Sequence, residues 1–182
     1  MTSISNDNIE TLLSKIRSLY KHHNRSSEPM DDEELPVVPV TPLEETLSFR
    51  IGGSILPYLG QGWGAPEGDI IWSTAAECYL ILRLAPAKGD LIVRFTGEYL
   101  RTKELPITPI ELWLNNRIIG SWDEHHQGEL STLVFQDQIP ASRILRLVFK
   151  FKSPRSPKEL GISDDVRLLG YAFKSMQIKE II

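Results

Sequence analysis

The chain has 182 residues, of which 41% are hydrophobic and 24% charged, and its formal net charge is -4. These values predict a soluble globular domain with an extension, and the acidic balance argues against broad nucleic-acid binding, which needs a basic surface. The single cysteine, Cys78, excludes an internal disulfide. Met1 to Asn8 are polar, and no apolar run approaches the about 20 residues of a membrane span, so we expect a cytoplasmic protein.

The first predicted element is an amphipathic helix within residues 1–23, running from Asp7 to about His23. Asp7 and Glu10 have the spacing of a capping box. Apolar residues recur at helical intervals at Ile9, Leu12, Leu13, Ile16, Leu19 and Tyr20. A helix of this length is marginal alone in water, so its apolar stripe is expected to pack on the main domain, on a second copy of the chain or on another protein.

Residues 24–46 are predicted to form a flexible linker with an acidic run from Asp31 to Glu34. Prolines interrupt this segment at Pro29, Pro36, Pro39 and Pro42. Frequent prolines favour an extended chain, and the few apolar residues cannot offset the entropy of ordering it. The helix is therefore expected to be tethered to the following domain rather than built into it.

Residues 47–182 are predicted to form an all-β domain, because short strands alternate with turn residues as in a sandwich or barrel. The predicted strands are Leu47–Ile51, Ile70–Trp72, Cys78–Leu84, Asp90–Tyr99, Ile110–Leu114, Arg117–Trp122, Ser131–Phe135, Ile144–Phe151 and Leu169–Ile178. Apolar and polar side chains alternate in Asp90–Tyr99 and Ile144–Phe151, which indicates one core face and one wet face. Asn115-Asn116 predicts a tight hairpin, since asparagine tolerates positive φ.

Three polar segments carry a resemblance to a known family. They are Gly62-Trp63-Gly64 with Pro66-Glu67-Gly68 and Trp72-Ser73, the hairpin Leu114-Asn115-Asn116 with Gly120-Ser121-Trp122, and Ser156-Pro157 through Gly170. With them, the chain from about Gly52 to Ile178 resembles the jelly-roll, carbohydrate-binding-module-like accessory domain of bacterial glycosyltransferases and other cell-surface polysaccharide biosynthesis proteins. The resemblance implies a jelly-roll β-sandwich without catalytic activity. No glycosyltransferase is fused here, which leaves the helix as the expected route to a partner.

The tryptophans are the first candidates for a saccharide site, because sugar rings stack their C–H faces on exposed indoles; the alternative for each is a place in the core. Trp113 alternates with Leu112 and Leu114, so it is predicted to lie on the polar sheet face with Glu111. Trp63 lies among glycines, where a loop can expose it. The other two tryptophans end strands and are expected to be structural.

Asp164, Asp165 and Arg167 form a charge cluster in the loop between Ser156 and Gly170. Such carboxylates can bind a ligand hydroxyl or a hard cation, but the simpler interpretation is that one aspartate holds Arg167 bidentately and locks the loop. The complete expected saccharide site consists of Trp63, Glu67, Trp113, Asp164 and Arg167.

Catalytic and metal chemistry are not expected. His125 and His126 are adjacent, so in a strand they would point to opposite faces, and we expect a hairpin tip there. Glu67 and Asp69 lie two residues apart on one strand and cannot flank a glycosidic bond. No nucleophile motif or phosphate-binding loop is present. We therefore expect no enzyme, no metal and no cofactor.

Two functions remain open beside a third, a metal-dependent enzyme of cupin type, which would need a bound transition metal and is tested by metal analysis of the purified protein. The first is a non-catalytic carbohydrate-binding module, accessory to bacterial cell-surface polysaccharide or glycan biosynthesis. The second is a structural or assembly protein whose N-terminal helix self-associates or recruits a glycosyltransferase or another enzyme.

Overall fold

The structure is a computed structural model that describes residues 37–100, 108–123, 126 and 129–181. The helix expected within residues 1–23 lies outside the described residues, as does most of the expected linker. The segment Pro36–Ile182 forms one compact unit. Its first strand, β1 (Val40–Thr41), falls inside the range expected to be linker, so the ordered sheet begins before Leu47.

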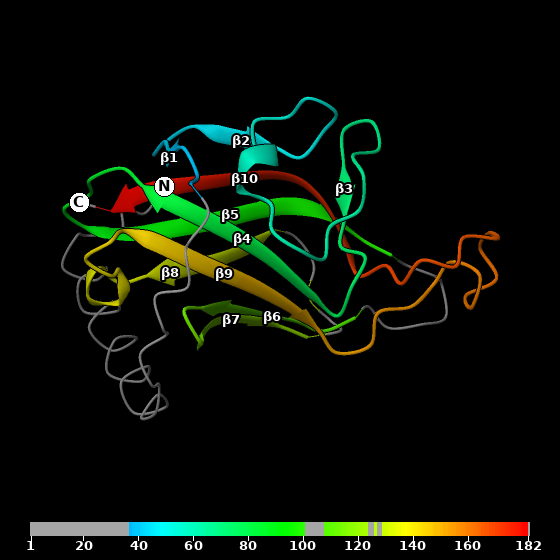
Figure 1. Ribbon diagram of the computed structural model, residues 1–182. Helices are drawn as coiled ribbons and strands as arrows, with labels where there is room; N and C mark the ends of the chain where they lie inside the picture. The colour runs from blue at the N-terminus through cyan, green and yellow to red at the C-terminus, as the bar shows by residue number, and fades with distance from the viewer. Residues whose placement is uncertain (1–36, 101–107, 124–125, 127–128, 182) are drawn as a thin grey trace, which may run out of the picture. The chain divides into compact units, whose positions relative to one another are not determined.

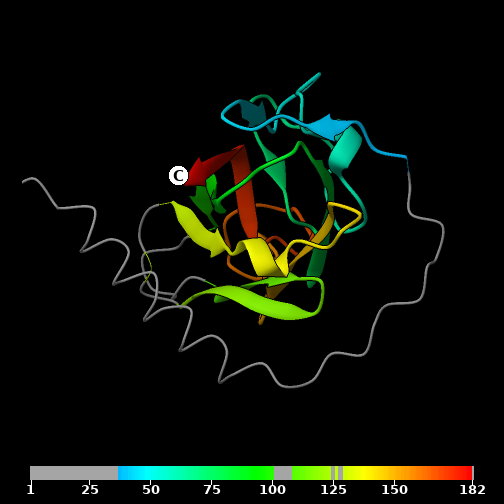
Figure 2. The same ribbon diagram turned by 90° about the vertical axis from the view of Figure 1, so that its left-hand side faces the viewer.

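The described chain is an all-β sandwich of two sheets, as the sequence predicts (Figures 1 and 2). The first sheet has the order β1, β4 (Glu77–Leu84), β9 (Ile144–Phe151), β6 (Ile110–Leu114) and β7 (Arg117–Trp122). The second has the order β2 (Thr46–Ser48), β10 (Tyr171–Ile181), β5 (Asp90–Tyr99) and β8 (Leu130–Val134), with β3 (Ile71–Trp72) paired to β10. Two short 3-10 helices, η1 (Leu56–Tyr58) and η2 (Gln136–Gln138), lie in connections.

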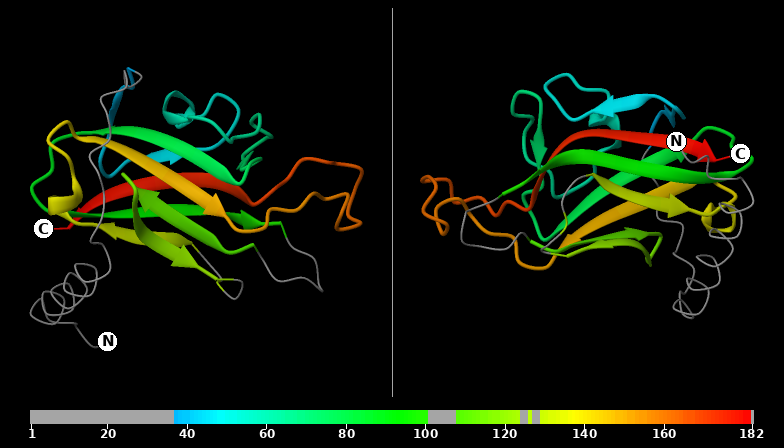
Figure 3. Two further views of the ribbon diagram at one scale, coloured as in Figure 1. Left: turned by 60° about the horizontal axis from the view of Figure 1, so that its bottom comes forward. Right: turned by 180° about the vertical axis from the view of Figure 1, so that it is seen from behind.

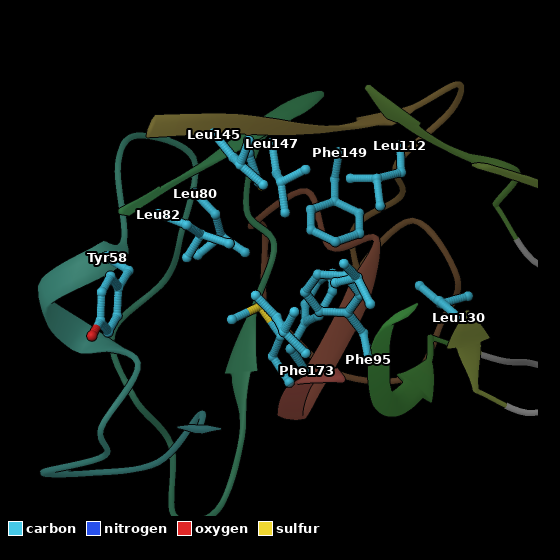
Figure 4. Close-up of a cluster of buried hydrophobic side chains, with 14 of the residues drawn as sticks. Tyr58, Leu80, Leu82, Phe95, Leu112, Leu130, Leu145, Leu147, Phe149 and Phe173 are labelled. Atoms are coloured by element: carbon cyan, nitrogen blue, oxygen red, sulfur yellow. The ribbon is translucent and has the colours of Figure 1, made fainter. Parts of the chain in front are cut away.

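The strand pairs between named strands are antiparallel except β1 with β4, which is parallel. The alternating pattern of β9 sends Leu145, Leu147 and Phe149 inward, where they meet Phe95 and Phe173 of the second sheet (Figure 4). The ring centroid of Phe149 lies 4.8 Å from those of both Phe95 and Phe173. Because each of these side chains is fully buried, each contributes about 1.5–3 kcal/mol of hydrophobic stabilisation.

The hairpin between β6 and β7 turns at Asn115 and Asn116, whose φ angles of 44° and 70° are positive, as the sequence predicts. The Asn115 side chain also ties the hairpin to the next strand, because its Oδ1 accepts a hydrogen bond from the backbone N–H of Arg146 at 3.0 Å. The hairpin therefore fixes the position of β6 relative to β9.

The loop between β9 and β10 projects beyond the strand ends, and Figure 1 shows it in orange. Ser156 and Glu159 bond reciprocally, since each backbone N–H donates to the other side chain at 3.1 Å. Lys158 donates its backbone N–H to the carbonyl of Asp165 at 2.9 Å. These internal bonds give the loop a defined shape.

Candidate functional site

The solvent side of the first sheet carries a concentrated group of aromatic and charged side chains. We call this group the outer face and define it as Glu77, Tyr79, Ile81, Arg83, Glu111, Trp113, Arg146, Val148, Lys150 and Lys152. It arises because β4 and β9 alternate, with Cys78, Leu80 and Leu82 turned into the core. Figure 3 shows β9 between β4 and the β6–β7 hairpin, so residues from three strands share this face.

An aromatic row crosses the middle of the outer face. Tyr79 is the register partner of Val148, and Val148 is the register partner of Trp113. Val148 is 8% exposed, so the floor between the two aromatic residues is apolar and covered. Because neighbouring strands lie about 4.8 Å apart, the backbones of Tyr79 and Trp113 are separated by about 10 Å across β9.

A charged row lies beside the aromatic row and consists of Glu77, Lys150 and Glu111, again in register. Lys150 Nζ lies 3.1 Å from Glu77 Oε1 and 4.5 Å from the ring centroid of Trp113. Trp113 Nε1 donates to Glu111 Oε2 at 3.1 Å. The indole predicted to lie on the polar face with Glu111 does lie there, half-buried and hydrogen-bonded to that carboxylate.

The electrostatics of the charged row centre on Glu77. The Tyr79 hydroxyl donates a hydrogen bond to its carboxylate, and with the Lys150 ammonium this lowers the pKa of Glu77. The same bond raises the pKa of Tyr79, because losing the hydroxyl proton beside a carboxylate is unfavourable. At the opposite corner, Lys152 Nζ lies 3.3 Å from Glu111 Oε1. Each carboxylate of the row is therefore paired with a lysine.

Arg146 lies on the other side of the aromatic row. Its guanidinium carbon is 4.9 Å from the ring centroid of Tyr79, and its register partner on β4 is Ile81. The outer face thus has Arg83 and Arg146 toward one end, carboxylates with lysines at the other, and aromatic rings between them.

Trp63 does not have the exposed position expected of it. It is half-buried and packs against the core, with ring centroids 5.5 Å from Phe49 and 5.0 Å from Phe173. Its Nε1 donates to the backbone carbonyl of Tyr79 at 2.7 Å, so the indole edge closes the sandwich beside β4. Trp113 lies on the outer side of the first sheet, so the two indoles do not form one stacking surface.

The neighbouring glycines explain the position of Trp63. A Cβ on Gly62 would lie 2.1 Å from the carbonyl oxygen of Glu77, and a Cβ on Gly60 would lie 2.9 Å from the Cβ of Tyr79. These glycines allow the segment to approach β4 closely, which is a packing role rather than a sign of an exposed loop.

The remaining tryptophans have structural positions. Trp122 is buried and is the register partner of Ile110, which is also buried. Trp72 is half-buried in β3, where it pairs with Ala172 of β10.

The second candidate cluster joins the β9–β10 loop to the turn before β3. Arg167 donates to Asp165 through Nε and Nη2, at 3.0 and 2.6 Å from Oδ2, and to Glu67 Oε1 through Nη1 at 2.6 Å. These ion pairs lower the pKa of Asp165 and raise that of Arg167. One aspartate holds the arginine bidentately, and that aspartate is Asp165. Asp164 is exposed.

The five residues of the expected saccharide site therefore separate. Glu67 and Arg167 contact each other, Asp164 lies in the same loop, Trp113 lies on the outer face, and Trp63 packs into the core. Sequence reasoning missed Lys150 as a neighbour of Trp113, and it missed Tyr79 and Arg146 as members of the same face. The alternation in β4 and β9 indicates that they face solvent, but only the strand register brings them together.

Two searches of the described part of the chain concern metal ligands and membrane-spanning helices. His126 Nε2 lies 3.1 Å from the backbone carbonyl of Glu129, while His125 is outside the described residues. No group of three or more potential metal ligands occurs among the described side chains. None of the helices in the described ranges has the length and apolar composition that crossing a membrane requires.

The chain matches no protein-family model, and it has no match among curated proteins. A sandwich fold hosts many unrelated activities, so the chemistry of the site, and not the fold, bears on function.

Proposed function

We propose that the β domain is a non-catalytic carbohydrate-binding module of jelly-roll type, accessory to bacterial cell-surface polysaccharide or glycan biosynthesis. The observation that carries this proposal is the position of Trp113 on the solvent side of β6, between Glu111 and Lys150. An indole supplies an apolar surface for the C–H face of a sugar ring, and adjacent carboxylates and ammonium groups bond its hydroxyls.

The proposed binding mode must accommodate Lys150, whose ammonium lies over the Trp113 ring. A sugar ring that stacks on this indole displaces the ammonium or shares the ring with it. Losing an exposed cation–π contact costs about 0.5–1 kcal/mol, which offsets much of the stacking gain. We therefore expect a single site to be weak, in the millimolar range familiar for small ligands on open surfaces.

A partner enzyme or self-association supplies the remaining affinity in this proposal. The apolar residues Leu12 and Ile16 of the expected N-terminal helix are its contact points. If two copies of the domain are linked, the second binding event becomes intramolecular, and avidity rises without any new contact. The module itself is proposed to bind and localise a glycan, with the chemistry left to the partner.

Calorimetric titration of the full chain with host polysaccharide fragments tests the proposal. Trp113→Ala is expected to weaken binding by about 1 kcal/mol or more, because the stacking surface is removed. Ile51→Ala is the matched control, since Ile51 is an exposed apolar residue between β2 and η1 and does not belong to the outer face. Equal binding by wild type and Trp113→Ala, or no binding of any fragment, would reject the proposal.

One observation favours the assembly function as a second candidate. The projecting loop exposes three apolar side chains, Ile162, Val166 and Leu168. Exposed apolar groups on an ordered loop are a feature of protein contact sites. Light scattering separates the two functions when the full chain is compared with a variant in which Ile162, Val166 and Leu168 are all replaced by serine. If the loop mediates assembly, the variant should form a smaller particle than the wild type. The carbohydrate-binding function does not require this change.

A further inference from the structure

We infer that the outer face binds a linear glycan that crosses its strands and contacts two equivalent subsites, one on β4 and one on β6. This inference rests on the proposed function and adds the direction and the minimum length of the ligand. It follows from an arrangement of side chains that the outer face contains twice.

The repeated arrangement is a glutamate followed two residues later by an aromatic residue. These residues are Glu77 and Tyr79 on β4. They are Glu111 and Trp113 on β6. In each arrangement Oε2 of the glutamate accepts a hydrogen bond from the aromatic side chain, from the hydroxyl of Tyr79 on β4 and from Nε1 of Trp113 on β6. Each carboxylate is therefore held beside the ring that follows it.

A lysine of β9 completes each arrangement. Lys150 Nζ lies 3.1 Å from Glu77 Oε1, and Lys152 Nζ lies 3.3 Å from Glu111 Oε1. An ionised carboxylate has about four acceptor positions, so its contacts with the aromatic donor and the lysine leave positions for a ligand. The Glu77 side chain is 41% exposed and the Glu111 side chain 22%, so solvent reaches both carboxylates. Both are thus oriented in advance and accessible.

The two arrangements are related by a translation across β9. β4 and β6 are both antiparallel to β9, so they run in the same direction. The two glutamates share the register partner Lys150, and the two aromatic residues share the register partner Val148. At about 4.8 Å between neighbouring strands, the two subsites lie about 10 Å apart. A single sugar ring cannot span this distance, whereas a short linear chain of sugars can.

A linear glycan suits two subsites of this kind because it presents the same groups repeatedly along its length. At each subsite a sugar hydroxyl donates to the carboxylate, and hydrogen bonds to an ionised acceptor are stronger than those between neutral groups. C–H groups of the same sugar contact the exposed part of the aromatic ring. The lysines orient the carboxylates, and the ion pairs stay intact.

The rings explain why one subsite is not enough. Tyr79 and Trp113 are half-buried, with Arg146 over the first ring and Lys150 over the second, so each ring offers only part of its surface. Arg146 keeps its present contacts in this binding mode. Because stacking on either ring is limited, affinity depends on filling both subsites with one chain, where the second contact becomes intramolecular.

The test measures how affinity depends on the length of the glycan. Neutral linear gluco-, manno-, xylo- and galacto-oligosaccharides of one to four sugars are titrated into the full chain by calorimetry. In the series that binds, we expect the tetrasaccharide to bind at least about tenfold more tightly than the monosaccharide, because it reaches both subsites. A fully O-methylated tetrasaccharide keeps its rings but lacks hydroxyl donors, and it should not show this gain.

Variants assign the gain to the subsite on β4. Glu77→Leu and Tyr79→Ala should each reduce the affinity for the tetrasaccharide to about that for the monosaccharide, while monosaccharide binding beside Trp113 remains. A purely structural role of either residue would instead weaken both ligands by the same factor. Glu98→Leu is the control, since it removes a carboxylate that pairs with Lys174 on the second sheet, and it should leave the gain intact.

The outcomes separate the inference from the proposed function. Equal affinity for the monosaccharide and the tetrasaccharide overturns the inference and leaves the saccharide-binding function intact. A gain with length that persists in both Glu77→Leu and Tyr79→Ala overturns it as well, since the second contact then lies elsewhere. Circular dichroism verifies that each variant is folded, and if neither folds, the length series of the wild type and the O-methylated chain decide. Absence of binding by every saccharide overturns both.

Discussion

Lys150 Nζ lies 4.5 Å from the ring centroid of Trp113, while the same ammonium is 3.1 Å from Glu77. The lysine therefore joins the indole on β6 to the carboxylate on β4 across the central strand of the outer face. Because an indole under an ammonium is partly shielded from solvent, Lys150 controls how much of Trp113 a ligand can reach.

Replacing Lys150 with methionine should expose the face of the indole to a neutral sugar while keeping the length of the side chain. We expect neutral oligosaccharides to bind as well or better, and stability to change by no more than about 1 kcal/mol, since the contacts are surface contacts. Fluorescence quenching by iodide, compared with Trp113→Phe, reports the accessibility of this indole. Weaker neutral binding in Lys150→Met would mean that the lysine contacts the sugar directly.

Trp63 and Trp113 should respond oppositely to truncation. Trp63→Ala removes a ring packed against Phe49 and Phe173 and should cost about 3 kcal/mol of unfolding free energy, with no specific effect on a ligand. Trp113→Ala should cost less, because the indole lies outside the core. Urea unfolding monitored by circular dichroism measures both. A larger loss in Trp113→Ala would show that the outer face is mainly a structural element.

The sequence predicts the faces of the strands more reliably than it predicts the site. Alternation in β6 places Trp113 beside Glu111 on the solvent side, and the two asparagines predict the hairpin that follows. Both features depend on local geometry. The contact of Trp113 with Lys150, and the presence of Tyr79 on the same face, depend on which strands are neighbours and in what register, which the pattern of a single strand does not encode.

The prediction that Trp63 is exposed was wrong for a different reason. A run of glycines is compatible with an exposed loop and equally with a segment pressed against another backbone, and only the structure distinguishes them. Here the carbonyl oxygen of Glu77 leaves no space for a Cβ at Gly62. The sequence also leaves open which of the two aspartates holds Arg167, since neighbouring aspartates in a loop diverge according to turn geometry that the sequence does not specify.

Acid should destabilise the domain in part through Glu77. Its pKa is lowered in the folded state by the Tyr79 hydroxyl and then by Lys150, relative to about 4.3 in the unfolded chain. The sign follows from linkage: the contribution to stability is present above the unfolded pKa and is lost as pH falls through the folded pKa. Urea unfolding of wild type and Glu77→Gln from about pH 6 to pH 3 should therefore converge at the acid end. With Glu45→Gln as the control, a constant gap between wild type and Glu77→Gln would contradict the prediction.

The Arg167 ion pairs should order the β9–β10 loop without stabilising the whole domain. Because the paired side chains are partly exposed to solvent, which screens the ion pairs, their contribution to global stability is small. Asp165→Ala and Arg167→Ala should each speed amide hydrogen exchange in residues 156–170, and Asp164→Ala should not. The double variant of Asp165→Ala and Arg167→Ala should exchange no faster than whichever of these two single variants exchanges faster. Faster exchange in Asp164→Ala would restore that residue to the cluster.

The boundary of the β domain can be located by truncation. Val38 and Thr41 are both buried, and β1 pairs in parallel with β4 at Arg83 and Leu84, so the segment around β1 belongs to the sandwich. Deletion of residues 1–35 should therefore leave a cooperative unfolding transition close to that of the full chain. Deletion through Pro42 removes β1 and a buried valine, and it should lower the midpoint clearly.

Charged substitutions in the N-terminal segment complete this test, because they separate assembly from folding. Leu12→Glu with Ile16→Glu should abolish any oligomer seen by light scattering while leaving the unfolding midpoint unchanged. If these substitutions or the deletion of residues 1–35 lower the midpoint as much as deletion through Pro42 does, the N-terminal segment packs on the β domain. In that case it is not a separate contact site for a partner, and it cannot supply avidity for glycan binding.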